Sequence, residues 1–298
     1  MKISICLLSY NRKEELQIVL TSFYHLLNEE INEIILLDQC SNDGSREMIS
    51  KEFLLVKLKF LNKNLGVAGG RDFLIKNSNS EICVFLDDDS YFKDTDDLVK
   101  ISNIFKNNNH VKFTSFKITN LNNELADWPH PRALKYKSNN EWRCLNFVGC
   151  GHAIRKDAYL KTGGYNTLSH FYAEELDLTY KLFNHFGSKM GLHVGSIEII
   201  HLASAKQRLH WSGKRLEYRV KNRISFYIQN FSYFSPLTYL FVSGFILSDM
   251  ILAWKNKNIK SFLAGLKQIS IRSKHRMSFK DSINYQYLYF KLFFGNEI

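Results

Sequence analysis

The alternation of short apolar runs with helical patterns over the first third of the chain most constrains its fold. Four apolar runs are predicted to be buried strands, and each is followed by a polar turn and then a helical pattern. The four runs are residues 3–9, 34–37, 56–61 and 82–86. Continuous apolar strands that alternate with helices predict an α/β fold, with a mainly parallel sheet and helices on both faces. The middle of the chain is less regular, and residues 125–142 are expected to form a long loop.

Polar residues follow each predicted strand. They are Ser9 to Asn11, Asp38, the stretch "NLGVAGGR" at residues 64–71, and the triplet "DDD" at residues 87–89. Because ligands of open α/β sheets bind at the carboxyl ends of the strands, we expect the four clusters to converge on one edge.

The triplet Asp87, Asp88 and Asp89 indicates a nearby cation. Adjacent carboxylates repel one another, and burying them unpaired is unfavourable. A hard divalent ion such as Mg²⁺ or Mn²⁺ would satisfy them. The alternative is an acidic N-terminus of the helix expected at residues 98–106.

Composition limits the partners of the chain. The 298 residues carry a formal net charge of +11, which suggests a partner with phosphate groups. Nucleic acid is not expected, because acids at several strand ends would repel its backbone and no helix-turn-helix, zinc or RNP-like pattern is present.

The five cysteines form no CxxC pair and the N-terminus turns polar too soon for a signal peptide, so we expect a cytoplasmic protein.

The chain changes character near residue 231. Residues 235–254 are almost entirely apolar but include Asp249, which makes them borderline for a spanning helix of ~20 residues. The following residues, 255–280, are strongly basic with interspersed apolar side chains. This pattern fits a peripheral segment on an anionic membrane surface, at the inner face of the cell membrane. The alternative is a buried helical subdomain or a dimer contact with a solvated basic face.

A series of motifs occurs in a fixed order along the chain. They are "ISICLLSYNR", "LLDQCSNDGS", "NLGVAGGRD", "FLDDDS", "GGYN", "FYAEELDLTYKL", "IEIIH" and "RVKNRISFYIQN". Together they resemble family 2 glycosyltransferases of the GT-A fold, which use nucleotide sugars and carry a DxD-type motif. The resemblance covers about residues 1–230, and it implies a nucleotide-binding half at residues 1–92 and an acceptor and catalytic half at residues 93–230. Residues 231–298 would form a helical C-terminal extension.

The resemblance also implies roles for individual residues. Nucleotide contacts are expected at Ser9, Tyr10, Asn11, Asp38, Asn64, Gly70, Arg71, Asp87 and Asp88. Asp89 and His201 would bind the metal, although His201 could instead be an ordinary half-buried histidine at a strand end. Glu175 would be the catalytic base, with Glu174 and Asp177 as neighbours. The family usually has Glu-Asp where this chain has Glu174-Glu175, and all three acids could instead belong to the first turn of a helix.

A basic stretch follows His201. Lys206, Arg208 and Arg215 are candidates for a loop that closes over the diphosphate and excludes water. The alternative for each residue is a solvated basic loop.

The implied activity is metal-dependent, inverting transfer of a sugar from a UDP- or dTDP-sugar to a hydroxyl of a glycan or lipid-linked acceptor, in surface polysaccharide synthesis. Mn²⁺ or Mg²⁺ would neutralise the leaving diphosphate, and a carboxylate would accept the acceptor proton. One alternative is a nucleotidyltransferase that makes sugar nucleotides, although "SYNRKEE" lacks the glycine-rich phosphate loop of such enzymes. Another is a non-catalytic, membrane-attached protein that binds nucleotide sugars.

Overall fold

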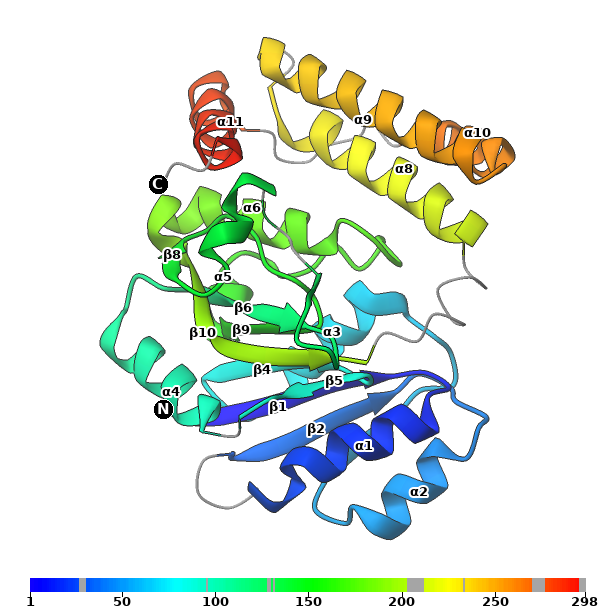
Figure 1. The fold of residues 1–298 in the computed structure, drawn as a ribbon, viewed down its shortest axis with the longest axis vertical. Helices are drawn as coiled ribbons and strands as arrows, with labels where there is room; N and C mark the ends of the chain where they lie inside the picture. The colour runs from blue at the N-terminus through cyan, green and yellow to red at the C-terminus, as the bar shows by residue number, and fades with distance from the viewer. Residues whose placement is uncertain are drawn as a thin grey trace.

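The structure is a computed structural model of the chain. It describes residues 1–26, 31–94, 96–127, 130, 132–202, 212–232, 234–269 and 277–294. A ten-stranded sheet lies at the centre, and a group of helices lies beyond one of its faces (Figure 1).

The sheet is parallel in one half and mixed in the other. Its strands are β1 (Ile3–Ser9), β2 (Glu33–Asp38), β3 (Lys57–Phe60), β4 (Ile82–Asp87), β5 (Ser90–Phe92), β6 (Phe113–Thr119), β7 (Leu125–Asp127), β8 (Glu141–Arg143), β9 (Gly151–Arg155) and β10 (Gly191–His201). Their order is β3-β2-β1-β4-β9-β6-β10-β5, with β7 paired to β6 and β8 to β10. The four strands predicted from sequence are parallel to one another, whereas β9 is antiparallel to both β4 and β6.

Helices cover both faces of the sheet, as predicted. They are α1 (Lys13–Phe23), α2 (Ser45–Glu52), α3 (Gly66–Asn77), α4 (Asp97–Asn107), α5 (Lys156–Lys161) and α6 (Glu174–Phe186). The apolar side chains of α1, α2 and α4 join one core cluster, and those of α3, α5 and α6 join the other. The helical spacing of Leu16, Val19, Leu20 and Phe23 places all four on the buried side of α1.

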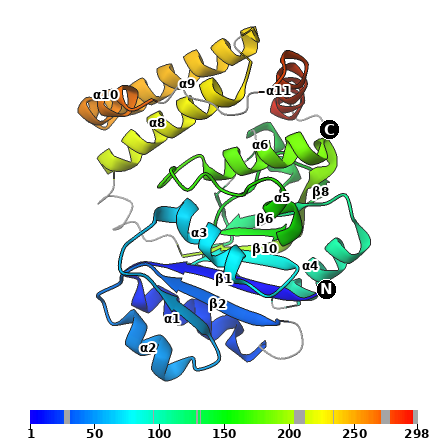
Figure 2. The same cartoon turned by 180° about the vertical axis from the view of Figure 1, so that it is seen from behind.

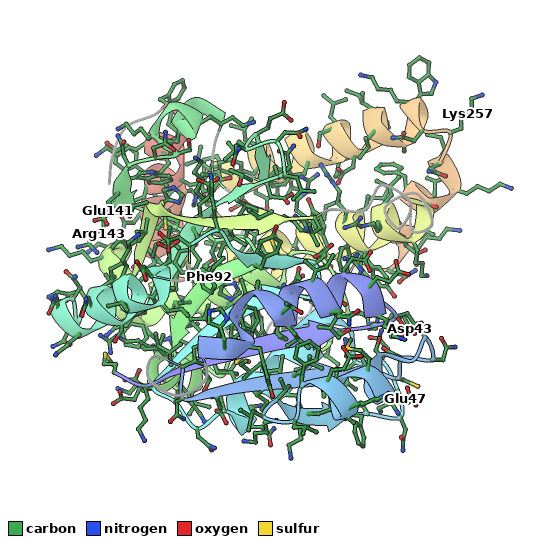
Figure 3. All side chains as sticks on the ribbon, turned by 60° about the horizontal axis from the view of Figure 1, so that its bottom comes forward. Asp43, Glu47, Phe92, Glu141, Arg143 and Lys257 are labelled. Carbon is green, nitrogen blue, oxygen red and sulfur yellow. The ribbon has the colours of Figure 1, made fainter. Side chains whose placement is uncertain are left out.

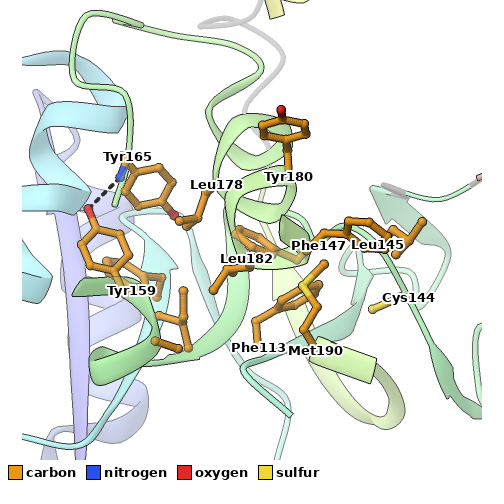
Figure 4. Packing of buried hydrophobic residues seen from close by; sticks show 14 of the residues in the cluster. Phe113, Cys144, Leu145, Phe147, Tyr159, Tyr165, Leu178, Tyr180, Leu182 and Met190 are labelled. Atoms are coloured by element: carbon orange, nitrogen blue, oxygen red, sulfur yellow. Dashed lines mark hydrogen bonds between the residues drawn. The ribbon is translucent and has the colours of Figure 1, made fainter. Parts of the chain in front are cut away.

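The core behind α3, α5 and α6 is rich in aromatic rings (Figure 4). Phe113 and Phe147 lie edge to face, with ring centroids 5.2 Å apart. The hydroxyl of Tyr159 accepts a hydrogen bond of 3.0 Å from the backbone N–H of Tyr165. This packing fixes the segment that leads into α6, where the predicted catalytic acids lie.

The segment expected to be a long loop is partly structured, so that expectation is wrong. It contains β7, a 3₁₀ turn at Arg132–Lys137 and β8. The two strands have three residues each, too few for an alternating pattern to be recognised.

Among the described residues, four helices lie together at the C-terminal end, and the term extension covers all four from here on, although α8 precedes residue 231: α8 (Ser212–Asn230), α9 (Pro236–Lys255), α10 (Ile259–Lys267) and α11 (Phe279–Phe293). Figures 1 and 2 show them stacked beyond α6. Because α8 packs on α9 and α10 as well as on α6, it connects the two predicted ranges 1–230 and 231–298. The division of the chain at residue 230 stays a prediction.

Helix α9 is apolar on its exposed side as well as its packed side. Leu240, Leu247 and Trp254 are 64%, 54% and 74% exposed. By length and composition alone, α9 could cross a membrane. Its acid, Asp249, is fully buried against two arginines of α8. Lys257, in the turn after α9, lies well separated from Asp43, which precedes α2, and from Glu47 in α2 (Figure 3).

Candidate active site

The predicted polar clusters converge where β1, β2, β4 and β10 end. In the register of the parallel strands, Ser9 lies beside Asp38, and Leu8 lies beside Asp87. Strand β5 runs antiparallel to the end of β10 and pairs Ser90 with His201. This pairing brings Asp89 to His201, although the two residues are far apart in sequence.

Each carboxylate of the triplet has a cationic partner. Nη2 of Arg71 lies 2.9 Å from Oδ1 of Asp87. The guanidinium of Arg12 lies 3.4 Å from Asp88 and also pairs with Asp89. Burial raises the pKa of Asp88 to about 8, against the opposing charge of Arg12. Burial also raises the pKa of Asp89, but the hydrogen bond from His201 and the charge of Arg12 outweigh it and leave that pKa below its ordinary value.

His201 links Asp89 to a residue that the sequence did not single out. Its Nε2 lies 3.3 Å from Oδ1 of Asp89, and its Nδ1 lies 2.6 Å from Oδ2 of Asp127. Burial lowers the pKa of His201, but the hydrogen bonds to the two carboxylates raise it well above its ordinary value. Asp127, Cys150 and His201 each place one ligand atom within 4.8 Å of the others.

Arg71 joins the triplet to the predicted catalytic acids. It is buried, and its Nη1 lies 3.3 Å from Glu175 and 3.7 Å from Glu174. A Cβ atom at Gly149 would overlap the ends of both the Arg71 and Glu175 side chains, which would have to shift. Gly149 therefore leaves room for the arginine and its carboxylate.

The two adjacent glutamates at the start of α6 differ in environment. The side chain of Glu174 is 4% exposed and that of Glu175 is 22% exposed. Burial, together with the charge of Glu175, raises the pKa of Glu174 to about 8. Of the two, Glu175 has the access to solvent that a group acting on substrate requires. Asp177 is buried and lies 2.6 Å from Nζ of Lys181, so it stabilises the helix locally.

The ends of β1 and β2 hold two buried oxygen atoms that have no hydrogen-bond partner among the described residues. They are Oγ of Ser9 and Oδ2 of Asp38. The other oxygen of Asp38 accepts hydrogen bonds from Nε of Arg46, at 2.6 Å, and from the backbone of Ser41. Buried polar atoms in proteins nearly always have a partner, so a polar ligand at this place would satisfy the pair. Tyr10 beside them is 40% exposed.

The remaining predicted nucleotide residues have structural contacts. Asn11 has a φ of 52° and accepts a hydrogen bond from the backbone of Asn42. Asn64 accepts one from Gly66 at the start of α3. Gly70 packs so closely on Leu8 that a Cβ atom there would overlap it. Contacts of these residues with a nucleotide stay predictions.

The predicted basic loop is only partly within the described residues. Lys206 and Arg208 lie outside them. Arg215 lies in α8, not in a loop, because Leu216, Val220 and Ile224 form the apolar face of a helix that begins at Ser212. The loop placement of Arg215 is therefore wrong.

Sequence reasoning missed four residues of this region: Arg12, Arg46, Asp127 and Cys150. A signal existed for Arg12, a cation shortly after the end of β1, whereas Arg46 lies within α2 and had none. Asp127 had none, because it lies in the segment expected to be an unstructured loop.

The donor atoms at His201 fit a divalent metal ion. Asp89 and Nε2 of His201 face each other closely enough for one ion to contact both, whereas Asp127 holds the other ring nitrogen, Nδ1, and would orient the imidazole. Carboxylate oxygens suit Mg²⁺ and Mn²⁺, whereas imidazole is a ligand of transition metals more than of Mg²⁺. The set therefore fits Mn²⁺ better than Mg²⁺.

A half-parallel, half-mixed sheet with acids gathered at its carboxyl edge is the GT-A architecture of glycosyltransferases, and solved structures with this fold are similar to the chain. GalNAc-T7, solved with UDP, GalNAc and Mn²⁺, has a TM-score of 0.59 and 16% identity over 76% of this chain, which spans 47% of that one. TarS of S. aureus, residues 1–349, has a TM-score of 0.59 and 12% identity, with 90% and 83% of the two chains covered. The mannosyltransferase PcManGT of Pyrobaculum calidifontis, solved with GDP-Man and Mn²⁺, has a TM-score of 0.56 and 14% identity, with 89% and 74% covered.

The family follows from the sequence comparison. Residues 4–163 match the model described as Glycosyl transferase family 2, and the chain belongs to this family. It is therefore a glycosyltransferase, as the motifs had indicated. A relative from Haemophilus influenzae, described as an uncharacterized protein, is 31% identical over 172 residues, which are 54% of this chain and 91% of the relative.

Proposed function

We propose that this glycosyltransferase is metal-dependent and inverting, and that it moves a sugar from a UDP- or dTDP-sugar to a hydroxyl of a glycan or lipid-linked acceptor in surface polysaccharide synthesis. The observation that carries the proposal is the pairing of Asp89 with His201 at 3.3 Å, beside the ends of the parallel strands. GalNAc-T7 and PcManGT, which share the fold, were both solved with Mn²⁺ and a nucleotide or nucleotide sugar.

The two unpartnered oxygens at the ends of β1 and β2 support a pyrimidine nucleotide. Oδ2 of Asp38 can accept the ring N–H of uracil or thymine, and Oγ of Ser9 can donate to a carbonyl of the base. The exposed ring of Tyr10 is available to stack on the base. Asp87, the last residue of β4, and Asp88, the residue after it, are the proposed hydrogen-bond acceptors for the ribose hydroxyls.

The metal, held by Asp89 and His201, would act as a Lewis acid on the departing diphosphate. Glu175 accepts the proton of the attacking hydroxyl. The buried guanidinium of Arg71 orients the Glu175 carboxylate by a hydrogen bond to its Oε1. Glu174 stays buried behind the same arginine and does not reach substrate. Attack from the face opposite the diphosphate inverts the anomeric carbon.

We also propose that the extension holds the protein at the anionic inner face of the cell membrane. Helix α9 exposes Leu240, Leu247 and Trp254 in a row at helical spacing. Between Lys255 and Gln268 the chain carries four lysines and no acid. Apolar side chains next to unopposed positive charge are the combination that binds anionic bilayers.

A panel of sugar nucleotides tests the proposed reaction. The purified protein is incubated with UDP-, dTDP- and GDP-linked sugars, with and without Mn²⁺, and binding and release of the nucleoside diphosphate are measured. We expect metal-dependent binding and slow hydrolysis of a UDP- or dTDP-sugar. Preference for a GDP-sugar would contradict the pyrimidine assignment. Release of pyrophosphate from a nucleoside triphosphate would favour the nucleotidyltransferase, and binding without any turnover would favour the non-catalytic protein.

A further inference from the structure

A pocket lies between the loop that precedes α6 and the helices of the extension. Its volume is about 340 Å³, near the lower end of the ~300–1,000 Å³ typical of small-molecule sites. Phe171 and Tyr172 of the loop form one wall, and side chains of α8 and of the end of α9 form the other. Apart from Arg215, which the sequence made a candidate for the diphosphate loop, none of the nucleotide or metal residues discussed above lines it.

Two arginines of α8 line the pocket and stack on the two aromatic rings of the loop. The guanidinium of Arg215 lies 5.0 Å from the ring centroid of Phe171, and that of Arg219 lies 5.6 Å from that of Tyr172. Nδ2 of Asn222 donates a 2.7 Å hydrogen bond to the carbonyl of Phe171, which fixes the loop on α8. The N–H groups of a guanidinium lie in its own plane. When one face of the guanidinium covers an aromatic ring, these N–H groups point outward from its edge and can still bind an anion.

The charges around the pocket favour an anion. Among the residues that the structure describes, no carboxylate lines it, and Asn256 and Asn258 complete its polar lining. The buried carboxylate of Asp249 lies 2.8 Å from Arg219 and 2.6 Å from Arg223. One negative charge therefore faces two arginines, and Arg215 lines the pocket one turn earlier on the same helix.

The apolar part of the lining indicates what the anion is attached to. Leu216 and Leu252 line the pocket beside the arginines. Leu252 lies on α9, and its neighbours Ile251 and Trp254 are 44% and 74% exposed on the apolar surface of that helix. A hydrocarbon chain attached to a phosphate in the pocket would thus find apolar surface directly beside it.

The pocket lies close to the proposed catalytic base. Tyr172 precedes Glu175 by three residues, a length of chain that spans at most about 11 Å. Tyr172 and Ala173 both have a positive φ, 74° and 69°, so the backbone turns sharply between the pocket and the first turn of α6. Figures 1 and 2 show the start of α8 on the side of the molecule where β10 ends.

We propose that this pocket binds the phosphate group of a lipid-linked acceptor, with Arg215 and Arg219 on the phosphate and the hydrocarbon along α9. The inference rests on the proposed function and narrows its acceptor class from glycans in general to phosphate-bearing lipids. The bound phosphate holds the acceptor sugar at the loop that leads into α6 and Glu175. The extension therefore both attaches the enzyme to the bilayer and selects its acceptor.

Dodecyl phosphate is a suitable probe, because it combines a phosphate with a hydrocarbon chain. Its binding is measured by calorimetry below its micelle concentration, with dodecyl maltoside as the uncharged comparison. We expect the full-length protein to bind dodecyl phosphate, and Arg215→Gln to weaken binding about tenfold through loss of charge-assisted hydrogen bonds. Lys214→Gln is the matched control, since Lys214 neighbours Arg215 on α8 and is exposed but does not line the pocket.

A second variant keeps the test decisive if Arg215→Gln folds poorly. Asn258→Asp puts a negative charge into the lining, and Asp at the N-cap of α10 is favourable for the helix. We expect this variant to fold as the wild type does and to weaken dodecyl phosphate binding about tenfold. Equal binding by wild type, Arg215→Gln and Asn258→Asp, or an equal loss in Lys214→Gln, would overturn the inference.

Two further measurements are needed. One distinguishes the phosphate of an acceptor from that of a bilayer headgroup, and the other distinguishes failure of this inference from failure of the proposed function. If Arg215→Gln reduces flotation with phosphatidylglycerol vesicles as much as it reduces dodecyl phosphate binding, the pocket binds bilayer headgroups and the acceptor assignment is wrong. We expect flotation to be retained.

Loss of Mn²⁺-dependent UDP binding in Arg215→Gln would assign the arginine to the donor and overturn the inference. By contrast, a wild type that binds no nucleotide sugar would refute the proposed function itself.

Discussion

The carboxyl edge of the sheet and the C-terminal extension place their charges in opposite ways. At the sheet edge, Asp87, Asp88 and Asp89 lie at the margin of the core, and each is paired with Arg12, Arg71 or His201. In the extension, α9 turns apolar side chains outward and buries its one acid, Asp249. The first arrangement suits a polar ligand in an aqueous cleft. The second suits an apolar surrounding, so we infer that one enzyme meets a soluble donor at one end and a membrane at the other.

The largest effect is expected for the base at the sheet edge. Glu175→Gln removes the group that accepts the acceptor proton, and turnover should fall by about 10²–10⁴-fold while donor affinity is kept. Steady-state kinetics and nucleotide titration measure the two separately. Asp177→Asn, which removes a carboxylate from the same helix turn, is the control. Equal loss of donor affinity and turnover in Glu175→Gln would make Glu175 structural.

In the extension, the expected effect is on membrane binding. Leu240→Glu with Leu247→Glu puts two charges on the exposed side of α9, where each leucine would contribute about 1.5–3 kcal/mol on full burial in a bilayer. Flotation with phosphatidylglycerol vesicles should fall by at least about tenfold. Leu54→Glu is the matched control in the other region, since Leu54 is 76% exposed beside α2. If instead the double variant floats unchanged and a wild-type dimer dissociates, α9 is an interface between copies of the chain.

A smaller effect, on stability, is expected for Glu174. The folded protein holds its proton up to about pH 8, whereas the unfolded chain releases it near the ordinary pKa of 4.5. The folded state therefore binds more protons between these values, and the free energy of unfolding should fall as the pH rises through that interval. Urea denaturation at pH 5 and pH 8 should show a smaller difference for Glu174→Gln than for the wild type. An unchanged difference would contradict the raised pKa.

The sheet edge was predictable from sequence to a large extent. Strands β1, β2 and β4 are buried on both faces, so their residues are mainly apolar and the polar residue that ends each strand, an acid in β2 and β4, stands out. Parallel strands then require those acids to meet. The partners of the acids were harder to predict, because Arg12 pairs with Asp88 and Asp89 across a turn whose geometry no periodicity reveals.

The second half of the site was less predictable for a physical reason. Asp127 reaches His201 only because the three-residue strand β7 pairs with β6, and so short a strand has no recognisable pattern.

In the extension, the composition left two environments open for α9, a membrane surface or a buried helical contact. The burial of Asp249 against Arg219 and Arg223 shows which side of α9 faces the protein, a fact that depends on tertiary packing.

The central claim is that Asp89 and His201 hold one divalent ion against a diphosphate. Titration of Mn²⁺ in the presence of UDP, followed by electron paramagnetic resonance, tests it on the wild type, Asp89→Asn, His201→Gln and the control His185→Gln on the exposed side of α6. The account predicts that the first two variants each weaken Mn²⁺ binding by at least about tenfold, whereas His185→Gln binds as the wild type does. Wild-type affinity for Mn²⁺ in Asp89→Asn or His201→Gln would contradict it.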